Sequence, residues 1–418
     1  MDDEPRVEQL RQRRRELEAG LEAWARQGGE ATAPEEGRGL LFELGQVCHD
    51  LGALSAAIDA LQRALALDPP TLARRMEGLL LSNLGNCFAD AGEAARAVEC
   101  HQQALAISRK LGDRQGEGDD LNNLGNAFAA LGQVEHAVGL FKLALVVSRK
   151  AGDRRGEASR LGSLGLAYAA VGQMDEAIRC HERALVINRD LGERMAAGWN
   201  LGNLGAAYAL LGQVEQAIDA LEQALAIGRA TGDRRGVGNR LGSLGNVYLD
   251  SGQAERAMPL YEEALAVSRE IGDRRNEGTV LGNLGHAYAL RGQQERAIDL
   301  FEQALTVSRE IGDHRGEANR LGNLGLAYAE QGRWERAIGL YQEAMAISRE
   351  IGERRGEGLQ SWNLGLAYAQ QGDYAQAARH MQVLVDYERE IGHPDAEADA
   401  ARVQEVLRRG AGGQRADG

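Results

Sequence analysis

Apolar residues recur at intervals of three and four positions through most of the chain, which is the spacing of one buried face of an α-helix. Residues 334–351 show the pattern clearly. Ala337, Tyr341 and Ala344 fall on one side of a helix there, and Glu343 falls on the other. The pattern predicts an all-α protein built from amphipathic helices.

Residues 313–352 predict two such helices joined by a tight turn. Asp313 has the side chain of an N-cap, and the first helix is expected over residues 314–331. Gly332 then breaks the chain, and the second helix is expected over residues 334–351. The block therefore predicts one helical hairpin.

The same hairpin pattern occurs nine times. Blocks of 40 residues follow one another without an insertion from Leu41 to about residue 400. One leucine marks every block and is followed each time by glycine: Leu44, Leu84, Leu124, Leu164, Leu204, Leu244, Leu284, Leu324 and Leu364. A repeat of this length is a unit that cannot bury its apolar face alone, so neighbouring hairpins must stack into a continuous core. We therefore predict an α-solenoid whose function lies on a long repeated surface.

Small and large residues keep fixed places within the block. Aromatic side chains fill two of these places, represented by Tyr328 and Tyr341. Glycines inside the first helix, such as Gly325, each cost about 1 kcal/mol relative to alanine. We expect close helix contacts at these glycines to outweigh that cost.

The start of the chain differs from the repeats. Residues 1–37 are predicted to hold a capping helix over 6–27 and a linker over 29–34. The apolar side of the helix carries Val7, Leu10, Leu17, Leu21 and Trp24. Packing on the first repeat is the expected role of this helix, and docking of a partner is the alternative.

The end of the chain is expected to close the array. Residues 38–393 hold the nine repeats, residues 394–409 a C-terminal capping helix, and residues 410–418 a disordered tail. The capping helix is expected from Asp395 to Arg409, and its apolar side would carry Ala396, Ala400, Val403 and Leu407. Solenoids need such terminal caps.

The block at 313–352 resembles the tetratricopeptide repeat (TPR), whose large and small positions are matched by Leu321, Leu324, Gly325, Ala327, Tyr328, Gly332, Ala337, Tyr341 and Ala344. The resemblance implies a right-handed superhelix of helix-turn-helix repeats. The usual TPR block has about 34 residues, and only the first block here ends in the usual way, with Asp68-Pro69-Pro70 closing its second helix.

The 40-residue type of repeat, with its Gly-Asn-Leu-Gly and Gly-Asp-Arg signatures, is similar to that of the Pins/LGN group of G-protein signalling modulators, and more loosely to that of kinesin light chain. The Pins-type family carries G-protein-binding motifs after its repeats. None of these motifs precedes Gly418, so that function is not carried over.

Composition agrees with a helical array. Only 6 prolines occur among 418 residues, so long helices are uninterrupted. The first residues are charged and the chain lacks an apolar run of about 18 residues, so we expect neither a signal peptide nor a membrane span, and a cytoplasmic location. The few and irregularly spaced cysteines predict reduced, partly buried thiols: Cys48, Cys87, Cys100 and Cys180.

A formal net charge of −14 argues against binding to a nucleic-acid backbone. The arginines of Asp153-Arg154-Arg155 and its equivalents always stand beside acids at a helix junction. We expect them to pair with acids at the surface.

Three short motifs suggest a cofactor or metal site, but each fits better as part of the repeated helices. Gly236-Val237-Gly238 has the spacing of part of a dinucleotide loop, but no strand precedes it. Cys100-His101 and Cys180-His181 look like metal ligands, yet they occupy places that other blocks fill with apolar or aromatic residues. No set of serine, histidine and acid recurs with a catalytic rationale. We predict no metal, no cofactor and no enzymatic activity.

The resemblance implies that the first helices line a concave groove and expose the positions of Asn319, Asn323 and Leu326. The second of these positions is mostly asparagine: Asn83, Asn123, Asn203, Asn283, Asn323 and Asn363. An amide has both donors and an acceptor, so one amide per repeat would bind the backbone of an extended peptide. The third position varies in polarity and would supply selectivity through Asn86, Asn126, Asn246 and His286.

Trp199 interrupts a run of polar residues at the Asn319 position and is the best candidate for an anchor, because aromatic residues dominate binding energy at interfaces. The alternative role of the asparagines is to hydrogen-bond the adjacent repeat and hold the superhelix together.

The predicted function is that of a scaffold or adaptor that binds a protein or peptide partner in this groove, without nucleic acid or membrane. The rival hypothesis is a structural repeat protein that self-associates as a homo-oligomer.

Overall fold

A computed structural model describes residues 4–67 and 73–413 of the chain. These residues form helices α1 to α21 and contain no strand, which confirms the all-α prediction. The predicted Asp68-Pro69-Pro70 ending of the first repeat lies outside the described residues. The helices are α1 (Glu4–Arg26), α2 (Gly29–Thr32), α3 (Pro34–Asp50), α4 (Leu54–Ala66), α5 (Arg74–Asp90), α6 (Ala94–Leu111), α7 (Arg114–Ala130), α8 (Val134–Ala151), α9 (Arg154–Ala170), α10 (Met174–Asp190), α11 (Arg194–Leu210), α12 (Val214–Thr231), α13 (Arg234–Asp250), α14 (Ala254–Glu270), α15 (Arg274–Leu290), α16 (Gln294–Glu310), α17 (His314–Glu330), α18 (Trp334–Glu350), α19 (Arg354–Gln370), α20 (Tyr374–Ile391) and α21 (Ala396–Gly413).

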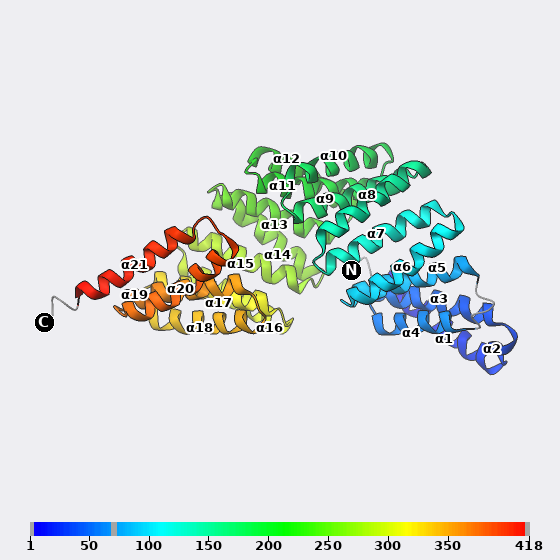
Figure 1. The fold of residues 1–418 in the computed structure, drawn as a ribbon, viewed down its shortest axis with the longest axis horizontal. Coiled ribbons are helices and arrows are strands. Elements are labelled where there is room, and N and C mark those ends of the chain that lie inside the picture. Colours follow the sequence, from blue (N-terminus) through cyan, green and yellow to red (C-terminus); the bar gives the residue numbers. More distant parts are fainter. Residues whose placement is uncertain (1–3, 68–72, 414–418) are drawn as a thin grey trace. The chain divides into compact units, whose positions relative to one another are not determined.

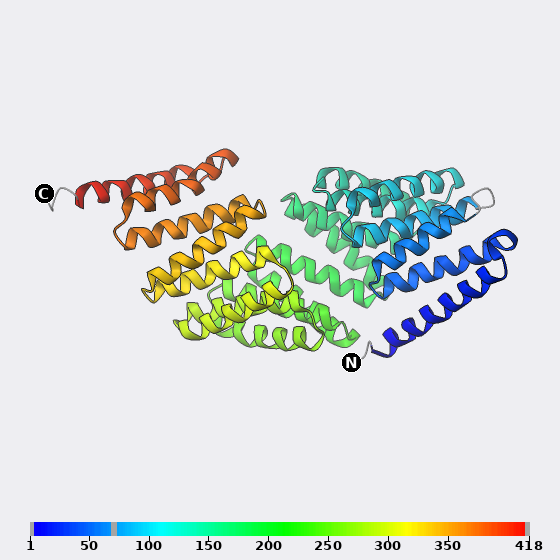
Figure 2. The same cartoon turned by 90° about the horizontal axis from the view of Figure 1, so that it is seen from below.

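The chain divides into two compact units, Met1–Leu211 and Gly212–Gly418, and each is a row of helical hairpins (Figures 1 and 2). Within a unit, each helix packs on the next one along the chain, and first helices also contact the first helix of the next repeat, as α7 does with α9 and α15 with α17. The stacking that the repeat predicted is therefore present in each unit. The handedness of the superhelix stays a prediction.

The boundaries of α17 and α18 agree with the predicted hairpin to within one residue, since each helix ends one residue earlier than expected. The carboxylate of Asp313 caps α17 by accepting a hydrogen bond of 3.0 Å from the backbone nitrogen of Gly316. Gly332 has a φ of 74°, a left-handed conformation that favours glycine and turns the chain between the two helices.

A large side chain from the second helix packs directly against the glycine that follows the repeated leucine, and we call this glycine position the seat. A Cβ atom added to Gly125 of α7 would lie 2.6 Å from the ring of Phe141 on α8, and Phe141 is only 2% exposed. Tyr261 covers Gly245 in the same way. The close helix contacts expected at these glycines are therefore confirmed.

Two histidines occupy the same seat. The rings of His101 and His181 lie over Gly85 and Gly165, and each histidine is 1% exposed. The neighbouring cysteines and the other two are buried as free thiols: Cys48, Cys87, Cys100 and Cys180. The Cys-His pairs are thus part of the core, as predicted. Within residues 4–67 and 73–413, no cluster of three or more histidines, cysteines or acids is placed to hold a metal ion.

The N-terminal helix α1 packs on α3 and buries Leu17, Leu21 and Trp24. The segment expected to be a linker is largely helical: Gly29–Thr32 forms α2, and Pro34 is the first residue of α3. The indole nitrogen of Trp24 donates a 2.9 Å hydrogen bond to the carbonyl of Ala33, which ties this segment to α1. The linker prediction was therefore wrong.

The C-terminal helix α21 runs to Gly413, so the part of the predicted disordered tail at residues 410–413 is helical, and residues 414–418 lie outside the described residues. A Cβ atom on Gly410 would lie 2.9 Å from that of Tyr374, so glycine lets the helix continue against α20. Leu407 is 43% exposed instead of packed, because Val406 takes the place beside Val403 in the core.

Among the helices of the described residues, none has both the length and the apolar character needed to cross a membrane.

Candidate functional site

The first helix of every repeat exposes one face. On α17 this face carries Asn319, Asn323, Leu326 and Glu330, whose spacing of four, three and four residues places them on one side of a helix. The equivalent positions recur every 40 residues from α3 to α19, and none of these residues is buried in any of the nine helices. We call this set of residues the stripe.

All of the predicted peptide-binding residues lie on the stripe. Those with an exposed side chain are Asn126, Trp199, Asn246, His286 and Asn319, and those that are half-buried are Asn83, Asn86, Asn123, Asn203, Asn283, Asn323 and Asn363. The fourth stripe position, that of Glu330, was missed from the sequence. Its signal was the continuation of the helical spacing four residues beyond Leu326.

In the second unit the stripe is hollowed between α13, α15 and α17. The hollow is a pocket of about 470 Å³ lined by Asn246, Leu249, Asp250, Gly282, Asn283, His286, Leu290 and Asn323. The structure therefore brings together four of the residues predicted from the sequence, and it adds one carboxylate, that of Asp250.

One pair of these asparagines connects adjacent repeats. The side-chain nitrogen of Asn283 donates to the side-chain oxygen of Asn246 at 2.9 Å, and the hydroxyl of Tyr261 donates to the same oxygen at 2.6 Å. Burial raises the pKa of Tyr261, with a smaller contribution from Asp250, so the hydroxyl keeps its proton and stays a donor. This is the structural role that was the alternative to peptide binding.

Other stripe asparagines are open. Within the described part of the chain, no side-chain hydrogen bond engages Asn123, Asn203, Asn323 or Asn363. Asn83 bonds only within its own helix, where its nitrogen donates to the carbonyl of Leu79 at 2.8 Å. Most stripe amides therefore keep donors and acceptors free for a ligand.

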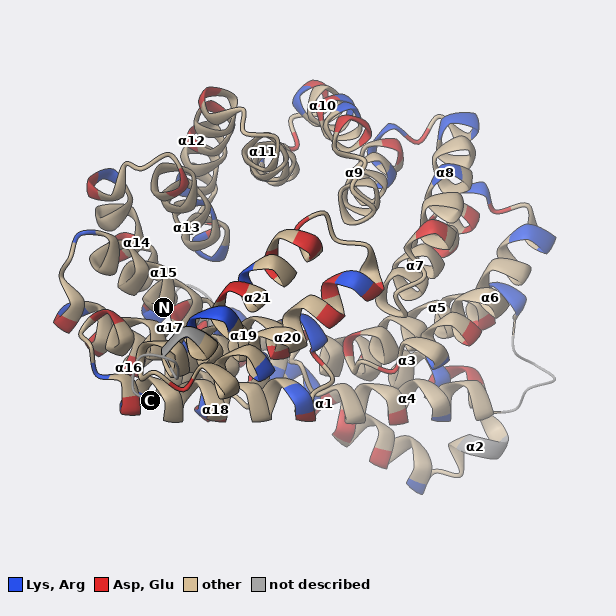
Figure 3. Cartoon of the chain, turned by 60° about the vertical axis from the view of Figure 1, so that its left-hand side comes forward, with Lys and Arg blue, Asp and Glu red and all other residues tan. Residues whose placement is uncertain are grey.

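In the first unit, five of the eight stripe positions on α9 and α11 are apolar, and the other three are Ser159, Ser163 and Asn203. Leu166 is 55% exposed, Trp199 is 56% exposed and Leu210 is 72% exposed, and the alanines at 170 and 206 are exposed beside them. Figure 3 shows α11 almost without charged residues, and Arg194 at its start is the one charge in its sequence. Trp199 is therefore one of several exposed apolar side chains on two neighbouring helices.

The stripe carries no lysine or arginine at any of its positions, although lysine and arginine make up 48 of the 418 residues. Its charged residues are all acids: Glu43, Asp50, Asp90, Asp119, Asp250 and Glu330. Four of them have ion-pair partners, Glu43 with Arg13 at 2.7 Å, Asp50 and Asp90 with His49 at 4.0 Å and 2.7 Å, and Asp119 with the buried Arg160. Glu330 accepts a hydrogen bond from the side chain of Gln294. The stripe therefore offers hydrogen-bonding, apolar and negative groups and lacks a group that would hold a carboxylate by charge.

The arginines of the chain lie elsewhere, and many of them pair with acids. Arg149 and Arg154 both hydrogen-bond the carboxylate of Glu157 at the junction of α8 and α9. Burial raises the pKa of Glu157, but the hydrogen bonds from Arg149 and Arg154 outweigh that effect, so its pKa is lowered and it stays ionised. The predicted pairing of these arginines is therefore observed.

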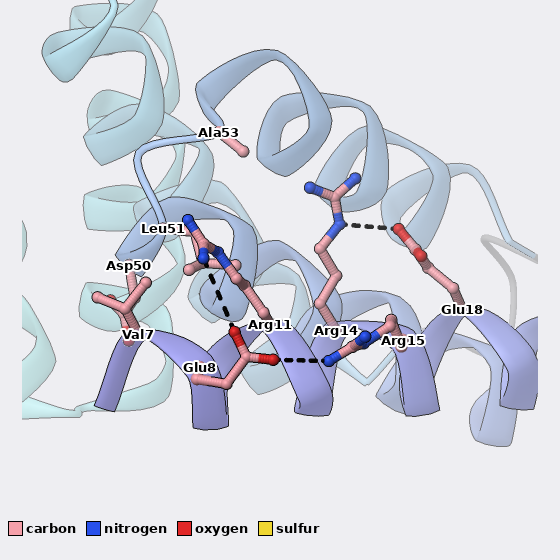
Figure 4. Close-up of a pocket in the computed structure, with 9 residues that line it drawn as sticks. All are labelled: Val7, Glu8, Arg11, Arg14, Arg15, Glu18, Asp50, Leu51 and Ala53. Carbon is pink, nitrogen blue, oxygen red and sulfur yellow. Dashed lines mark hydrogen bonds and ion pairs between the residues drawn. The ribbon is translucent and has the colours of Figure 1, made fainter. Parts of the chain in front are cut away.

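A further pocket, of about 580 Å³, lies between α1 and the end of α3 (Figure 4). Its three arginines face acids of the same helix: Arg11 lies 3.7 Å and Arg15 2.9 Å from Glu8, and Arg14 lies 2.8 Å from Glu18. Because each arginine has an acid partner, the pocket presents little free positive charge.

Comparison with protein families identifies the repeats. A tetratricopeptide repeat model matches residues 77–150, 157–230, 239–310, 295–350 and 316–387, and a second tetratricopeptide repeat model matches residues 39–71. These matches cover most of the chain and confirm the predicted resemblance. The finer likeness to the Pins/LGN group stays a prediction, and no curated protein matches the sequence.

Solved structures share the fold at low sequence identity. A signal transduction ATPase with a tetratricopeptide repeat sensor from Pyrococcus horikoshii has a TM-score of 0.62 at 17% identity, over 89% of this chain and 55% of that chain. The quorum sensor NprR from B. thuringiensis has a TM-score of 0.60 at 12% identity, over 87% of this chain and 99% of that chain. A Rap protein in complex with competence and sporulation factor has a TM-score of 0.51 at 14% identity, over 81% of this chain and 99% of that chain. At these identities the likeness shows the fold alone.

Proposed function

The chain belongs to the tetratricopeptide repeat family, and we propose that it is an adaptor that binds an extended segment of another protein on the stripe of its first helices. The observation that carries this proposal is the recurrence of open amides in both units, together with the pocket of about 470 Å³ that gathers Asn246, Asn283, His286 and Asn323. We assign binding and no chemical step to the chain.

Each part of the stripe suits a different part of the bound segment. An extended backbone offers one N–H and one C=O per residue, and the open amides of Asn203 and Asn323 supply the matching groups. The exposed ring of Trp199 is the proposed anchor for an apolar or aromatic side chain, and the exposed Leu166 and Leu210 offer further apolar contacts. The absence of lysine and arginine from the stripe disfavours an acidic segment.

The fold similarity supports this proposal. The Rap protein with the same fold is solved in complex with competence and sporulation factor, so a row of such hairpins is able to hold a ligand. In this chain the ligand is proposed to be a polypeptide segment, because the amides of the stripe are donors and acceptors that can pair with the backbone groups of an extended strand.

A display library of random peptides, selected on the immobilised full chain, tests the proposal. We expect enriched peptides to bind with a dissociation constant that the double variant L166A/W199A raises at least about 30-fold, the equivalent of about 2 kcal/mol for loss of an aromatic anchor.

The matched control is the double variant L143A/V186A. Leu143 on α8 and Val186 on α10 are 53% and 56% exposed, as the stripe residues are, but they lie on second helices. Equal weakening by both double variants, or unchanged binding by L166A/W199A, would overturn the proposal.

Self-association stays the rival hypothesis, and light scattering of the full chain separates the two. A molecular mass of 45.1 kDa at all concentrations removes the rival. A larger mass that L166A/W199A returns to the monomer value would instead make Leu166 and Trp199 part of a self-association surface.

A further inference from the structure

Glu388 differs from the residue that most repeats carry at the same position near the end of the second helix. The equivalent residue is a buried serine in five repeats: Ser108, Ser148, Ser268, Ser308 and Ser348. Glu388 on α20 is also buried, with 7% of its surface exposed, and its Oε2 atom has no hydrogen-bond partner among the described residues. A buried carboxylate without a partner costs free energy, so a group that satisfies it is to be expected.

Glu388 lines a pocket of about 540 Å³ formed by the start of α19, the end of α20 and the start of α21. The walls of the pocket are largely apolar and include Leu359, Trp362, Leu384 and Ile391. Leu359 and Ile391 are 44% and 53% exposed, so the pocket has an apolar entrance. A ligand that reaches Glu388 would therefore pass an apolar wall with an aromatic ring.

The pocket lining holds one more acid than arginine, and its exposed Arg355 makes no hydrogen bond or ion pair with Glu388 among the described residues. Its lining contains three carboxylates, those of Glu388, Asp395 and Asp399, and two guanidinium groups, those of Arg355 and Arg402. Arg402 forms an ion pair with Asp399 at 3.6 Å, and no ion pair joins it to Glu388 among the described residues.

His393 does not satisfy Glu388 either. Its Nδ1 atom accepts a hydrogen bond of 3.3 Å from the backbone nitrogen of Asp395, and it lies 3.9 Å from Glu388, an ion-pair distance that is too long for a hydrogen bond. Burial raises the pKa of Glu388, and Asp399 and Asp395 add to this effect against the opposing influence of His393. The buried carboxylate thus has no positive group hydrogen-bonded to it among the described residues.

We infer that this pocket binds the ammonium group of a ligand with an apolar arm, the chemistry shared by a lysine side chain and a free alkylamine. The ammonium donates hydrogen bonds to Glu388, and the arm lies along Leu359 and Trp362. An ammonium group is also attracted to the face of an indole ring. The inference is independent of the stripe and of the function proposed for it.

Two probes test the inference on the full chain: n-butylamine, and Nα-acetyl-lysine methylamide as a mimic of a lysine within a polypeptide. Titrations followed by the NMR signal of the Trp362 indole, assigned with the W362F variant, give dissociation constants. We expect both amines to bind and the neutral analogue n-butanol to bind at least about tenfold more weakly. Tighter binding of the lysine derivative would identify a polypeptide ligand, and tighter binding of butylamine a small amine.

The informative variant is E388S, because serine is the residue that five other repeats bury at this position. We expect E388S to weaken amine binding at least about tenfold. E390Q is the matched control, since Glu390 is an exposed acid on the same helix that pairs with Arg354 at 2.7 Å outside the pocket lining. Unchanged binding in E388S, equal weakening in E390Q, or equal binding of n-butanol would overturn the inference.

Discussion

The side-chain nitrogen of Asn283 donates a 2.9 Å hydrogen bond to the side-chain oxygen of Asn246, one repeat earlier in the chain. Asn323 occupies the same position as Asn283 in the next repeat, and no side-chain hydrogen bond engages it within the described residues. One asparagine position therefore connects repeats at one place and leaves its amide open at another. The structural role thus holds for Asn283, and the amide of Asn323 is left free for the proposed binding role.

Alanine substitutions at these two positions are expected to differ in stability. N283A removes a hydrogen bond between repeats and should lower the free energy of unfolding by about 1 kcal/mol. N323A removes no such bond and should lower it by less than about 0.5 kcal/mol. Urea denaturation followed by circular dichroism measures both, and an equal loss in the two variants would show that the open amide of Asn323 is also structural.

The seat of Phe141 on Gly125 gives a second matched pair. A Cβ atom on Gly125 would lie 2.6 Å from the Phe141 ring, whereas a Cβ atom on Gly139, inside α8, would meet no atom within 4 Å. G125A should therefore destabilise the chain by about 1 to 3 kcal/mol through overpacking. G139A should stabilise it by up to about 1 kcal/mol, because alanine has the higher helix propensity. The same sign for both changes in a thermal melt would contradict the role of Gly125 as a seat.

The parts of the fold that repeat could be predicted from the sequence, because a pattern shared by nine blocks does not depend on chance substitutions in any single block. Asp313 and Gly332 mark the limits of α17 in a way that recurs through the array, and these limits were predicted to within one residue. The amides of the stripe could be placed for the same reason, since the helical spacing that buries Leu324 leaves Asn323 only half-buried.

The parts that could not be predicted depend on single contacts. The bond from Trp24 to the carbonyl of Ala33 and the close approach of Gly410 to Tyr374 keep helical two segments whose composition resembles that of a linker and a tail. The bond between Asn283 and Asn246 also depends on how two particular repeats meet. No periodic pattern carries information of this kind.

Capping by Asp153 should be measurable as stability. Its carboxylate accepts a 2.8 Å hydrogen bond from the backbone nitrogen of Gly156, at the start of α9. D153A leaves that nitrogen without a partner and should lower the free energy of unfolding by about 1 kcal/mol, and D153S should retain most of the stability because serine is also a good N-cap. Denaturant titration of the three proteins tests this, and a loss in D153S as large as that in D153A would show that charge, and not the cap bond, stabilises the helix.

His101 should make the stability of the chain depend on pH. Burial lowers the pKa of His101 from 6.5 to about 4, and its ring is 1% exposed over Gly85. As the pH falls from 6.5 to 4, the unfolded chain takes up a proton at this residue while the folded chain does not, so acid favours unfolding and stability is lost over this window. The full difference corresponds to about 3 kcal/mol.

H101F removes this proton uptake and keeps a ring in the seat, as Phe141 does over Gly125. Urea midpoints measured between pH 6.5 and pH 4.5 should therefore fall more steeply for the unmodified chain than for H101F, with other titrating groups contributing equally to both proteins. H286Q, a change of the exposed His286 on the stripe, is the control and should follow the unmodified chain. A constant difference between the unmodified chain and H101F across this pH range would show that His101 is not the buried neutral group that the structure places over Gly85.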